Sequence, residues 1–320
     1  MRRAVVWGAV LTAVGAGAAG LVPPGAAASP AVPPGGGSVA AGSAVMVTPD
    51  LPKFRTYAYG KNARQRLDAY WRAPVKSARA KPGPAVLLLH GGYWIEGDKR
   101  DWKYVARRLA GDGFTVFAAD YRLAGPHAVW PAQRDDALAA LRFVKKNAKR
   151  WNVDPGRIAV VGSSAGGMLA TQLGTYGEGA KQVRGVVALS PVNNPYLAFR
   201  QGEAPDASSR QAKLRRAVVD LLGCVPGAVP GTEDDDLCWG RADDADAAVH
   251  ASAGDAPMLL MHAAGDFVPV THSTELASAL RAAGVAATVR TVAGNGHGTA
   301  QLGDPGVYSR ILAFLRARTR

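Results

Sequence analysis

The stretch RIAVVGSSAGGMLATQL, residues 157–173, joins an apolar run to a helical pattern through a turn of small residues. Residues 157–163 are expected to form a buried strand, and the segment from residue 165 onward a helix. The turn fits the pattern G-x-S-x-G, in which Ser164 is central and Ser163 is variable. Glycines permit a bend that side chains would block, and such a bend lifts the central hydroxyl above the sheet. We therefore predict that Ser164, and not Ser163, is the reactive serine.

A serine hydroxyl is a weak nucleophile, so a base and a group that orients the base are needed elsewhere in the chain. His297 lies in the loop GNGHG after the last predicted strand, and Asp266 follows another predicted strand, PMLLMHAAG. The order Ser164, Asp266, His297 matches one of the known orders of a catalytic triad. We predict that these residues form a Ser-His-Asp triad. The alternative is that Asp266 caps a helix and His297 is an ordinary loop residue.

Acyl transfer also needs N–H donors for the oxygen atom that becomes negatively charged. The predicted strand at 85–90 leads into HGGYW, which corresponds to an HGGG-type loop with tyrosine at the last glycine position. His90 is expected to brace this loop rather than to act as a base, and Trp94 is expected to line the substrate pocket. The oxyanion hole is expected to use the backbone N–H groups of Gly91, Gly92, Tyr93 and Ala165.

Apolar runs and helical patterns alternate from residue 54 to the end of the chain. Two aromatic segments, 54–60 and 66–73, are predicted to form a hairpin. Further strands are predicted at 85–90, 114–122, 157–163, 183–191, 257–265 and 287–294, and helices at 101–113, 131–151, 165–177, 271–284 and 307–319. This alternation indicates the α/β class, with a mostly parallel central sheet, helices on both faces and the hairpin as an antiparallel edge.

The alternation breaks at about residues 192–254, which we interpret as a cap insertion on the carboxyl side of the sheet, where ligands bind in such folds. One helix is predicted there, at 210–224, and the acidic run 233–236 is expected to be a solvated loop. The two cysteines of the chain, Cys224 and Cys238, fall in this insertion. We expect them to form a disulfide in an oxidising compartment, the alternative being two free thiols.

The N-terminal segment predicts export. Residues 1–28 begin with the positively charged MRR, continue with an apolar stretch and end in small residues before Ser29. This order is typical of a secretory signal peptide, the alternative being an uncleaved membrane anchor. We predict a secreted protein without stable membrane insertion after cleavage. Residues 29–50, rich in Pro, Gly, Ser and Ala, are predicted to be a flexible linker, and residues 51–320 the α/β domain.

The composition excludes several function classes. The formal net charge is +13, but no run of Lys and Arg with interleaved aromatic residues occurs, so nucleic-acid binding is not predicted. No nucleotide-binding glycine motif and no ligand spacing typical of a metal site is found, so neither a cofactor nor a metal is predicted. His262 is expected inside a buried strand. We expect the other histidines outside the predicted site to lie at the surface or in the cap; they are His127, His250 and His272.

Taken together, the motifs resemble a known family. HGGYW (90–94), DPGRIAVVGSSAGG (154–167), HAAGDFVP (262–269) and GNGHG (294–298) are similar to segments of α/β-hydrolase-fold serine esterases, of the hormone-sensitive-lipase and feruloyl or acetyl-xylan esterase kind. The resemblance covers roughly residues 54–320 apart from the cap. It implies the α/β-hydrolase fold and a carboxylic-ester hydrolase activity, with the triad and oxyanion loop described above.

The predicted function is that of a secreted serine hydrolase that cleaves a small-molecule or polymer-linked carboxylic ester through an acyl-enzyme intermediate. The HGGYW loop departs from HGGG at Tyr93 and is also similar to the loop of kynurenine-formamidase-like hydrolases. Arylformamidase, amidase or peptidase activity with the same triad is therefore an alternative. The alternative from another class is a catalytically inactive binding module on the hydrolase scaffold. No feature of the sequence indicates an oligomeric state.

Overall fold

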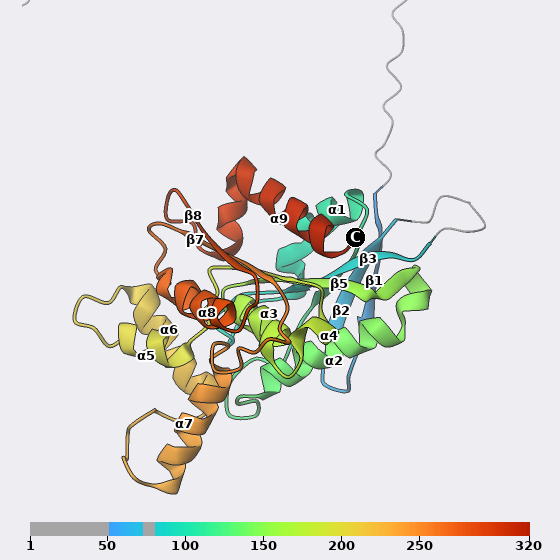
Figure 1. Ribbon diagram of the computed structural model, residues 1–320. Helices are drawn as coiled ribbons and strands as arrows, with labels where there is room; N and C mark the ends of the chain where they lie inside the picture. Colours follow the sequence, from blue (N-terminus) through green and yellow to red (C-terminus); the bar gives the residue numbers. More distant parts are fainter. Residues whose placement is uncertain (1–50, 73–80) are drawn as a thin grey trace, which may run out of the picture. The chain divides into compact units, whose positions relative to one another are not determined.

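A single sheet runs through the part of the chain that the computed structural model describes, residues 51–72 and 81–320 (Figure 1). The predicted signal peptide at 1–28 and the predicted linker at 29–50 lie outside the described residues. In chain order the strands are β1 (Lys53–Ala58), β2 (Arg66–Trp71), β3 (Gly83–Leu89), β4 (Thr115–Ala119), β5 (Val153–Ser163), β6 (Val186–Leu189), β7 (Met258–Ala263) and β8 (Ala287–Val292).

The strands lie in the order β1-β2-β4-β3-β5-β6-β7-β8. β2 pairs antiparallel with both β1 and β4, and every neighbouring pair from β4 to β8 is parallel. The expected mostly parallel sheet with an antiparallel hairpin at its edge is therefore confirmed. Because the parallel strands all point the same way, the loops that follow β3, β5, β6, β7 and β8 meet at one edge of the sheet.

Helices cover both faces of the sheet, as predicted (Figure 1). Alternate side chains of each strand point to opposite faces, so Leu87 and Leu89 of β3 join one apolar core and Val86 and Leu88 the other. One face is covered by α1 (Lys103–Gly111) and α9 (Pro305–Arg318), and the other by α2 (Ala132–Lys146), α3 (Ala165–Thr175) and α8 (Thr271–Ala282). Short helical segments are η1 (Lys99–Trp102), η2 (Ala148–Trp151), α4 (Gly179–Gln182) and η3 (Gly298–Gly303).

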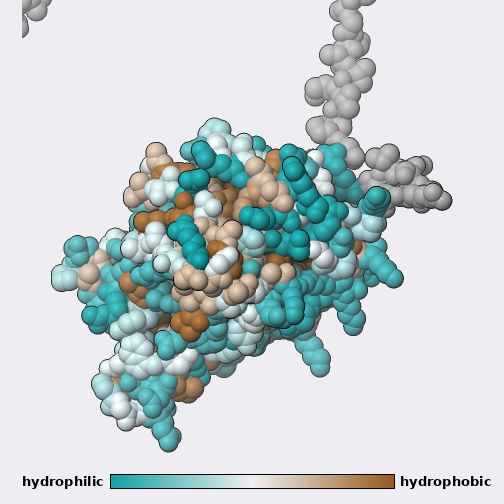
Figure 2. Space-filling model, in the orientation of Figure 1, coloured by the Kyte–Doolittle hydropathy of each residue, from teal (hydrophilic) through white to brown (hydrophobic). Residues whose placement is uncertain are grey.

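The surface is mostly polar on the side shown in Figure 2, where hydrophobic residues form small separate patches among hydrophilic ones. Within residues 51–72 and 81–320, no helix combines the length and the apolar character needed to cross a membrane. The same residues contain no group of three His, Cys, Asp or Glu side chains arranged to hold a metal ion.

The insertion between β6 and β7 contains more helix than the sequence predicts. It forms α5 (Pro195–Gln201), α6 (Ser209–Leu222) and α7 (Glu233–Ala245), so the expectation of a single helix is wrong. The acidic run expected to be a loop is the first turn of α7. Thr232 caps this helix by accepting a hydrogen bond from the backbone N–H of Asp235 at 3.2 Å. Acidic side chains are favourable here because the N-terminus of a helix carries a partial positive charge.

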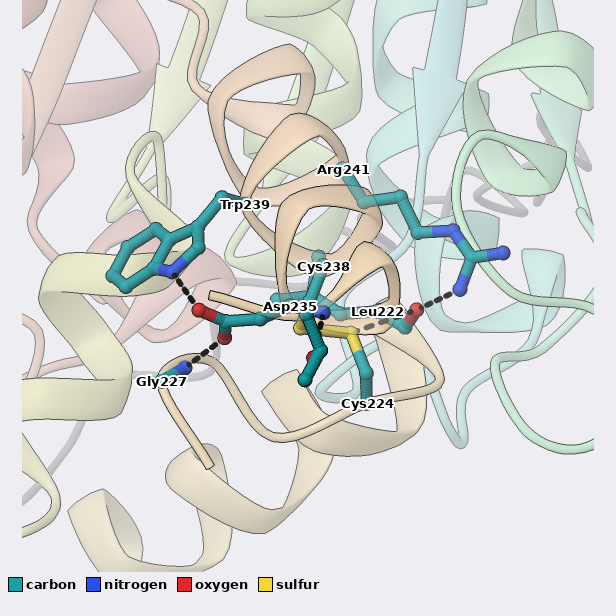
Figure 3. Close-up of a disulfide and its surroundings, with 8 residues drawn as sticks. Leu222, Cys224, Gly227, Asp235, Cys238, Trp239 and Arg241 are labelled. Carbon is teal, nitrogen blue, oxygen red and sulfur yellow. Dashed lines mark hydrogen bonds between the residues drawn. A yellow bond between two sulfur atoms is a disulfide. The ribbon is translucent and has the colours of Figure 1, made fainter. Parts of the chain in front are cut away.

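Cys224 and Cys238 form a disulfide, in agreement with the pairing expected from the sequence. Figure 3 shows that the bond joins the segment after α6 to the second turn of α7. Asp235 reinforces the connection by accepting hydrogen bonds from the backbone N–H of Gly227 at 2.9 Å and the indole N–H of Trp239 at 3.2 Å. The loop between the two helices is therefore closed by both covalent and polar contacts.

Polar contacts at several places attach the insertion to the sheet domain. At the C-terminal end of α7, Asp244 accepts hydrogen bonds from Arg134 of α2 at 2.8 Å and from the indole of Trp130 at 2.7 Å. From α6, the ammonium group of Lys213 lies 2.7 Å from a carboxylate oxygen of Glu96, in the loop after β3. Helix α6 therefore contacts the loop that is expected to form the oxyanion hole.

Two buried histidines connect β7, α8 and the insertion. His262 is buried in β7, as predicted, with Nε2 2.7 Å from the hydroxyl of Ser273. The expectation that His272 lies at the surface or in the cap is wrong, because it is buried on α8. Its Nδ1 accepts a hydrogen bond from the backbone N–H of Asn194 at 3.4 Å, and its Nε2 lies 3.2 Å from the amide oxygen of Gln201. Both ring nitrogens have partners, which allows a neutral imidazole to be buried.

The buried histidines make the fold sensitive to acid. Burial lowers the pKa of His90 and His262 to about 4 and that of His272 to about 3, whereas an unfolded histidine has a pKa of about 6.5. As the pH falls from 6.5 towards 4, the unfolded chain binds protons that the native protein does not bind. Each histidine then lowers the free energy of unfolding by about 1.4 kcal/mol per pH unit.

We expect the urea midpoint of unfolding to fall steadily between pH 7 and pH 5. Burial raises the pKa of Asp246 to about 6 and also raises the pKa of Asp120 and Asp255, so the native state binds protons at these carboxyls first and they oppose the trend. The three histidines prevail because they begin to titrate in the unfolded chain at a higher pH. A His272→Asn variant should show a shallower dependence on pH, since one titrating group is removed. A midpoint that stays constant down to pH 5 would contradict the expectation.

Candidate active site

The turn between β5 and α3 has the geometry expected of the G-x-S-x-G pattern. Ser164 has a φ of 54°, which residues other than glycine rarely adopt. A Cβ on Gly162 would lie 2.0 Å from the carbonyl oxygen of Gly166, and a Cβ on Gly166 would lie 2.2 Å from that of His90. Only glycine fits at these two positions, so the N-terminus of α3 packs directly against the ends of β3 and β5, with Ser164 at the turn.

The structure brings the three predicted triad residues together. The hydroxyl oxygen of Ser164 lies 2.8 Å from Nε2 of His297, and Nδ1 of His297 lies 2.8 Å from Oδ1 of Asp266. A carboxylate only accepts hydrogen bonds, so Nδ1 carries the proton that it donates to Asp266. Nε2 is then free to accept the hydrogen bond of the serine hydroxyl. The imidazole is thereby held in the tautomer that a general base requires.

Asp266 is held in its ionised form. Burial by itself raises its pKa, but the hydrogen bond and charge of His297, together with hydrogen bonds from Ser190 and the backbone of Val268, outweigh this effect and leave the pKa below its usual value. The backbone N–H of Val268 donates to Oδ1 at 3.1 Å, and the hydroxyl of Ser190 donates to Oδ2. Asp266 is therefore a carboxylate anion, which can orient the imidazole of His297.

Ser190 is a residue of this site that is not predicted from the sequence. It is completely buried at the end of β6, with a φ of 46°. Besides donating to Asp266, its hydroxyl accepts hydrogen bonds from the backbone N–H of Gly298 at 2.9 Å and the side-chain amide of Gln301 at 2.7 Å. Ser190 thus joins Asp266 to the loop of His297. The only sequence signal is a serine at the carboxyl end of a buried strand, where site residues gather.

Ser163 supports the histidine loop rather than the triad. Its hydroxyl accepts a hydrogen bond from the backbone N–H of Thr299 at 3.1 Å. A Cβ on Gly298 would lie 2.3 Å from this hydroxyl, so glycine at position 298 allows the loop to pass close to β5. The two adjacent serines therefore have different contacts: Ser164 with the imidazole of His297, and Ser163 with the backbone that follows it.

Gly91, Gly92 and Tyr93 line the same cleft as Ser164, which has a volume of about 500 Å³. Gly91 passes close to the serine, since a Cβ there would lie 3.1 Å from the Cβ of Ser164. Ala165 follows the serine as the first residue of α3. Within residues 51–72 and 81–320, no group accepts a hydrogen bond from the backbone N–H of Gly92, Tyr93 or Ala165. These N–H groups are available for an oxyanion.

Side chains outside the cleft hold the loop after β3 in place. The buried ring of His90 stacks on Tyr121 with 4.3 Å between ring centroids, and its Nδ1 donates a hydrogen bond to the carbonyl oxygen of Gly91 at 2.7 Å. Arg64 donates a hydrogen bond to the carbonyl oxygen of Gly97 at 2.7 Å. His90 contacts its own loop in this way, which supports the predicted bracing role.

Trp94 does not line the cleft. The backbone there has a φ of 62°, and the indole is completely buried in the apolar core on one face of the sheet. The expectation that Trp94 forms part of the substrate pocket is therefore wrong. Trp102, from η1, is the tryptophan that lines the cleft, together with the acidic residues Glu96 and Asp101.

Comparisons with curated proteins identify esterases among the relatives. Esterase LipC of Mycobacterium tuberculosis is 36% identical over 121 residues, which cover 38% of this chain and 29% of that protein. Ethyl acetate hydrolase of Pseudomonas putida is 42% identical over 144 residues, covering 45% of this chain and 42% of the relative. The chain thus spans less than half the length of these two curated relatives.

Solved structures of esterases are similar to this protein over most of the chain. EstE1, a thermophilic carboxylesterase cloned from a metagenomic library, superposes with a TM-score of 0.66 at 25% identity, covering 84% of this chain and 90% of that one. A carbohydrate esterase from gut microbiota, at 22% identity and a TM-score of 0.65, shares the fold and covers 83% of this chain and 96% of its own. Residues 86–301 match the alpha/beta hydrolase fold family, and because this match extends over more than half of the chain, the protein belongs to that family.

Proposed function

We propose that this protein is a serine hydrolase that cleaves carboxylic esters. The observation that carries the proposal is the continuous series of hydrogen bonds from Ser164 through His297 to Asp266, beside backbone N–H groups without acceptors among the described residues. The names of the relatives, an esterase and an ethyl acetate hydrolase, support an ester as the substrate. A complete triad also favours an enzyme over an inactive binding module.

The first half of the reaction forms an acyl-enzyme. Ser164 Oγ attacks the carbonyl carbon of the ester while Nε2 of His297 takes the hydroxyl proton. The resulting tetrahedral intermediate carries a negative charge on the former carbonyl oxygen. When it collapses, the bond to the alcohol oxygen breaks, and His297 gives its proton to the departing alcohol. Ser164 is left carrying the acyl group as an ester.

The second half releases the acid. Water attacks the acyl-enzyme as His297 takes a proton from it, and a second tetrahedral intermediate forms. Collapse of this intermediate breaks the bond to Ser164, which recovers its proton from His297. In both halves the backbone N–H groups of Gly92, Tyr93 and Ala165 stabilise the negative oxygen, with each donor worth about 3 kcal/mol in the transition state.

Ser190 acts as a positioning residue in this mechanism. Its hydroxyl holds the second carboxylate oxygen of Asp266 while its oxygen receives hydrogen bonds from Gly298 and Gln301. Rotation of the carboxylate would break both this network and the contact with His297. Ser190 therefore restricts Asp266 to the orientation that keeps Nδ1 of the imidazole protonated.

We also propose that the protein is exported. The order of charged, apolar and small residues at 1–28 supports a secretory signal peptide. The disulfide between Cys224 and Cys238 supports the same compartment, because structural disulfides persist in oxidising environments.

Replacing Ser164 by alanine should abolish hydrolysis of p-nitrophenyl acetate, with kcat falling about 10⁴-fold or more because the nucleophile is lost. Ser163→Ala is the comparison variant: it removes the neighbouring hydroxyl, which supports only the backbone of the histidine loop, so it should lower kcat far less than Ser164→Ala and keep the labelling by a fluorophosphonate probe. Turnover retained in Ser164→Ala would refute the triad. Faster hydrolysis of a formanilide than of the acetate would instead favour a formamidase.

Replacing Ser190 by alanine should lower kcat by about 10- to 100-fold, the effect of losing a hydrogen bond to a charged group, with little change in KM. The rate is measured per active site, titrated with a fluorophosphonate, so that unfolded protein does not count. Ser273→Ala removes another buried serine hydroxyl, bonded to His262, and should leave kcat unchanged. If Ser190→Ala lowers only the melting temperature, the serine has no positioning role.

Export is tested by expressing the full chain in a bacterial host and separating the medium from the membrane fraction. We expect N-terminal sequencing of the material in the medium to begin at Ser29, and thiol titration without reductant to find no free cysteine. Protein that stays in the membrane fraction with its N-terminal segment intact would support the uncleaved anchor instead.

A further inference from the structure

A second cavity, of about 430 Å³, adjoins the catalytic cleft. The two cavities share Tyr93 and His297, whereas Ser164 and the glycines of the oxyanion loop line only the first. Aromatic rings form part of its wall: Phe267 lies 6.2 Å from Tyr93 and 4.3 Å from His297 between ring centroids. The cavity therefore begins at the imidazole and extends away from the nucleophile.

The position of the cavity indicates which part of the ester it can bind. In the proposed mechanism the leaving alcohol receives its proton from Nε2 of His297, so the alcohol oxygen must lie next to the imidazole. A cavity that starts at His297 and does not include Ser164 is placed to receive what is attached to that oxygen. The acyl group, by contrast, remains bonded to Ser164 in the first cleft.

Arg210, in the first turn of α6, supplies the positive charge of the second cavity. Its guanidinium lies 5.7 Å from the centre of the Phe267 ring. No carboxylate among residues 51–72 and 81–320 lies within 4.0 Å of it. A guanidinium beside an aromatic wall presents several N–H donors in one plane, an arrangement that suits a carboxylate.

The neighbouring cation on α6 has a different environment. Lys213, one turn further along, lies 4.4 Å from the centre of the Tyr93 ring and is paired with Glu96 at 2.7 Å. Glu96 and Asp101 also give the first cleft an acidic lining. Lys213 and Glu96 therefore balance each other, which leaves Asp101 as an acidic residue of the first cleft and Arg210 as the basic residue of the second cavity.

We propose that the second cavity binds the alcohol part of the ester and that Arg210 selects alcohols that carry a carboxylate. This inference rests on the proposed esterase function and narrows its substrate class to esters of hydroxy acids. Arg210 binds the anionic group before and during acyl transfer and takes no part in the chemistry itself.

The test compares 4-acetoxybenzoate with the neutral 4-acetoxybenzamide, two acetyl esters of the same shape. We expect Arg210→Ala to lower kcat/KM about tenfold for the anionic ester, mainly through KM, and to leave the neutral ester unchanged. The preference should weaken as salt is added, because the guanidinium is exposed. Arg216→Ala is the matched control: this arginine is exposed on the same helix, lines neither cavity, and should behave as wild type.

Two outcomes would overturn the inference. One is an equal effect of Arg210→Ala on both acetyl esters. The other is an effect on p-nitrophenyl hemisuccinate, whose charge is on the acyl side, without an effect on 4-acetoxybenzoate. Failure of the wild-type protein to hydrolyse even 4-acetoxybenzamide and p-nitrophenyl acetate would instead count against the proposed esterase function, so the two failures are distinguishable.

Discussion

Close contact of backbone with backbone at the turn between β5 and α3 is the constraint on which the site depends. Neighbouring carbonyl oxygens occupy the space that a side chain at Gly162 or Gly166 would need. This contact sets the distance between α3 and the ends of β3 and β5. It therefore also sets the position of Ser164 relative to the loop after β3, where Gly91 passes directly beside the serine. The proposed nucleophile and the N–H groups proposed to stabilise the oxyanion are placed by one packing arrangement, before any substrate binds.

The remaining members of the triad reach this point from the other half of the sheet. Asp266 follows β7 and His297 follows β8, and the parallel register brings both loops to the edge where β5 ends. Two serines then hold the histidine loop: Ser163 at the end of β5 and Ser190 at the end of β6. The hydrogen-bond geometry of the triad thus depends on polar groups from neighbouring strands as well as on the three residues themselves. Helix α6 adds charged side chains beside this arrangement. The disulfide connects the segment after α6 to α7, and Asp244 connects α7 to Arg134 of α2.

The predictable parts of the protein are those encoded within short segments. Ser164, Asp266 and His297 each lie in the turn or loop that follows a strand, so local pattern and chain order suffice to predict them. The alternation of strands and helices predicts the sheet for the same reason. Errors arise where distant contacts decide. His272 is polar and yet buried, because Asn194 and Gln201 satisfy its ring, and Trp94 turns into the core at a positive φ. The acidic run is a different case, because its cap, Thr232, is the residue directly before it, and the error there was to overlook a local signal.

The amino-acid sequence by itself determined the class of fold and was enough to propose the nucleophile, the order of the triad and the residues of the oxyanion loop, because each depends on periodicity or on a few residues in a row. Only the tertiary structure decided that Ser190 supports Asp266, that α6 rather than Trp94 borders the site, and that Arg210 faces a second cavity beside His297. These features join residues from different strands and from the insertion. Their contacts arise from the register of the sheet and the packing of the helices, which no local pattern encodes.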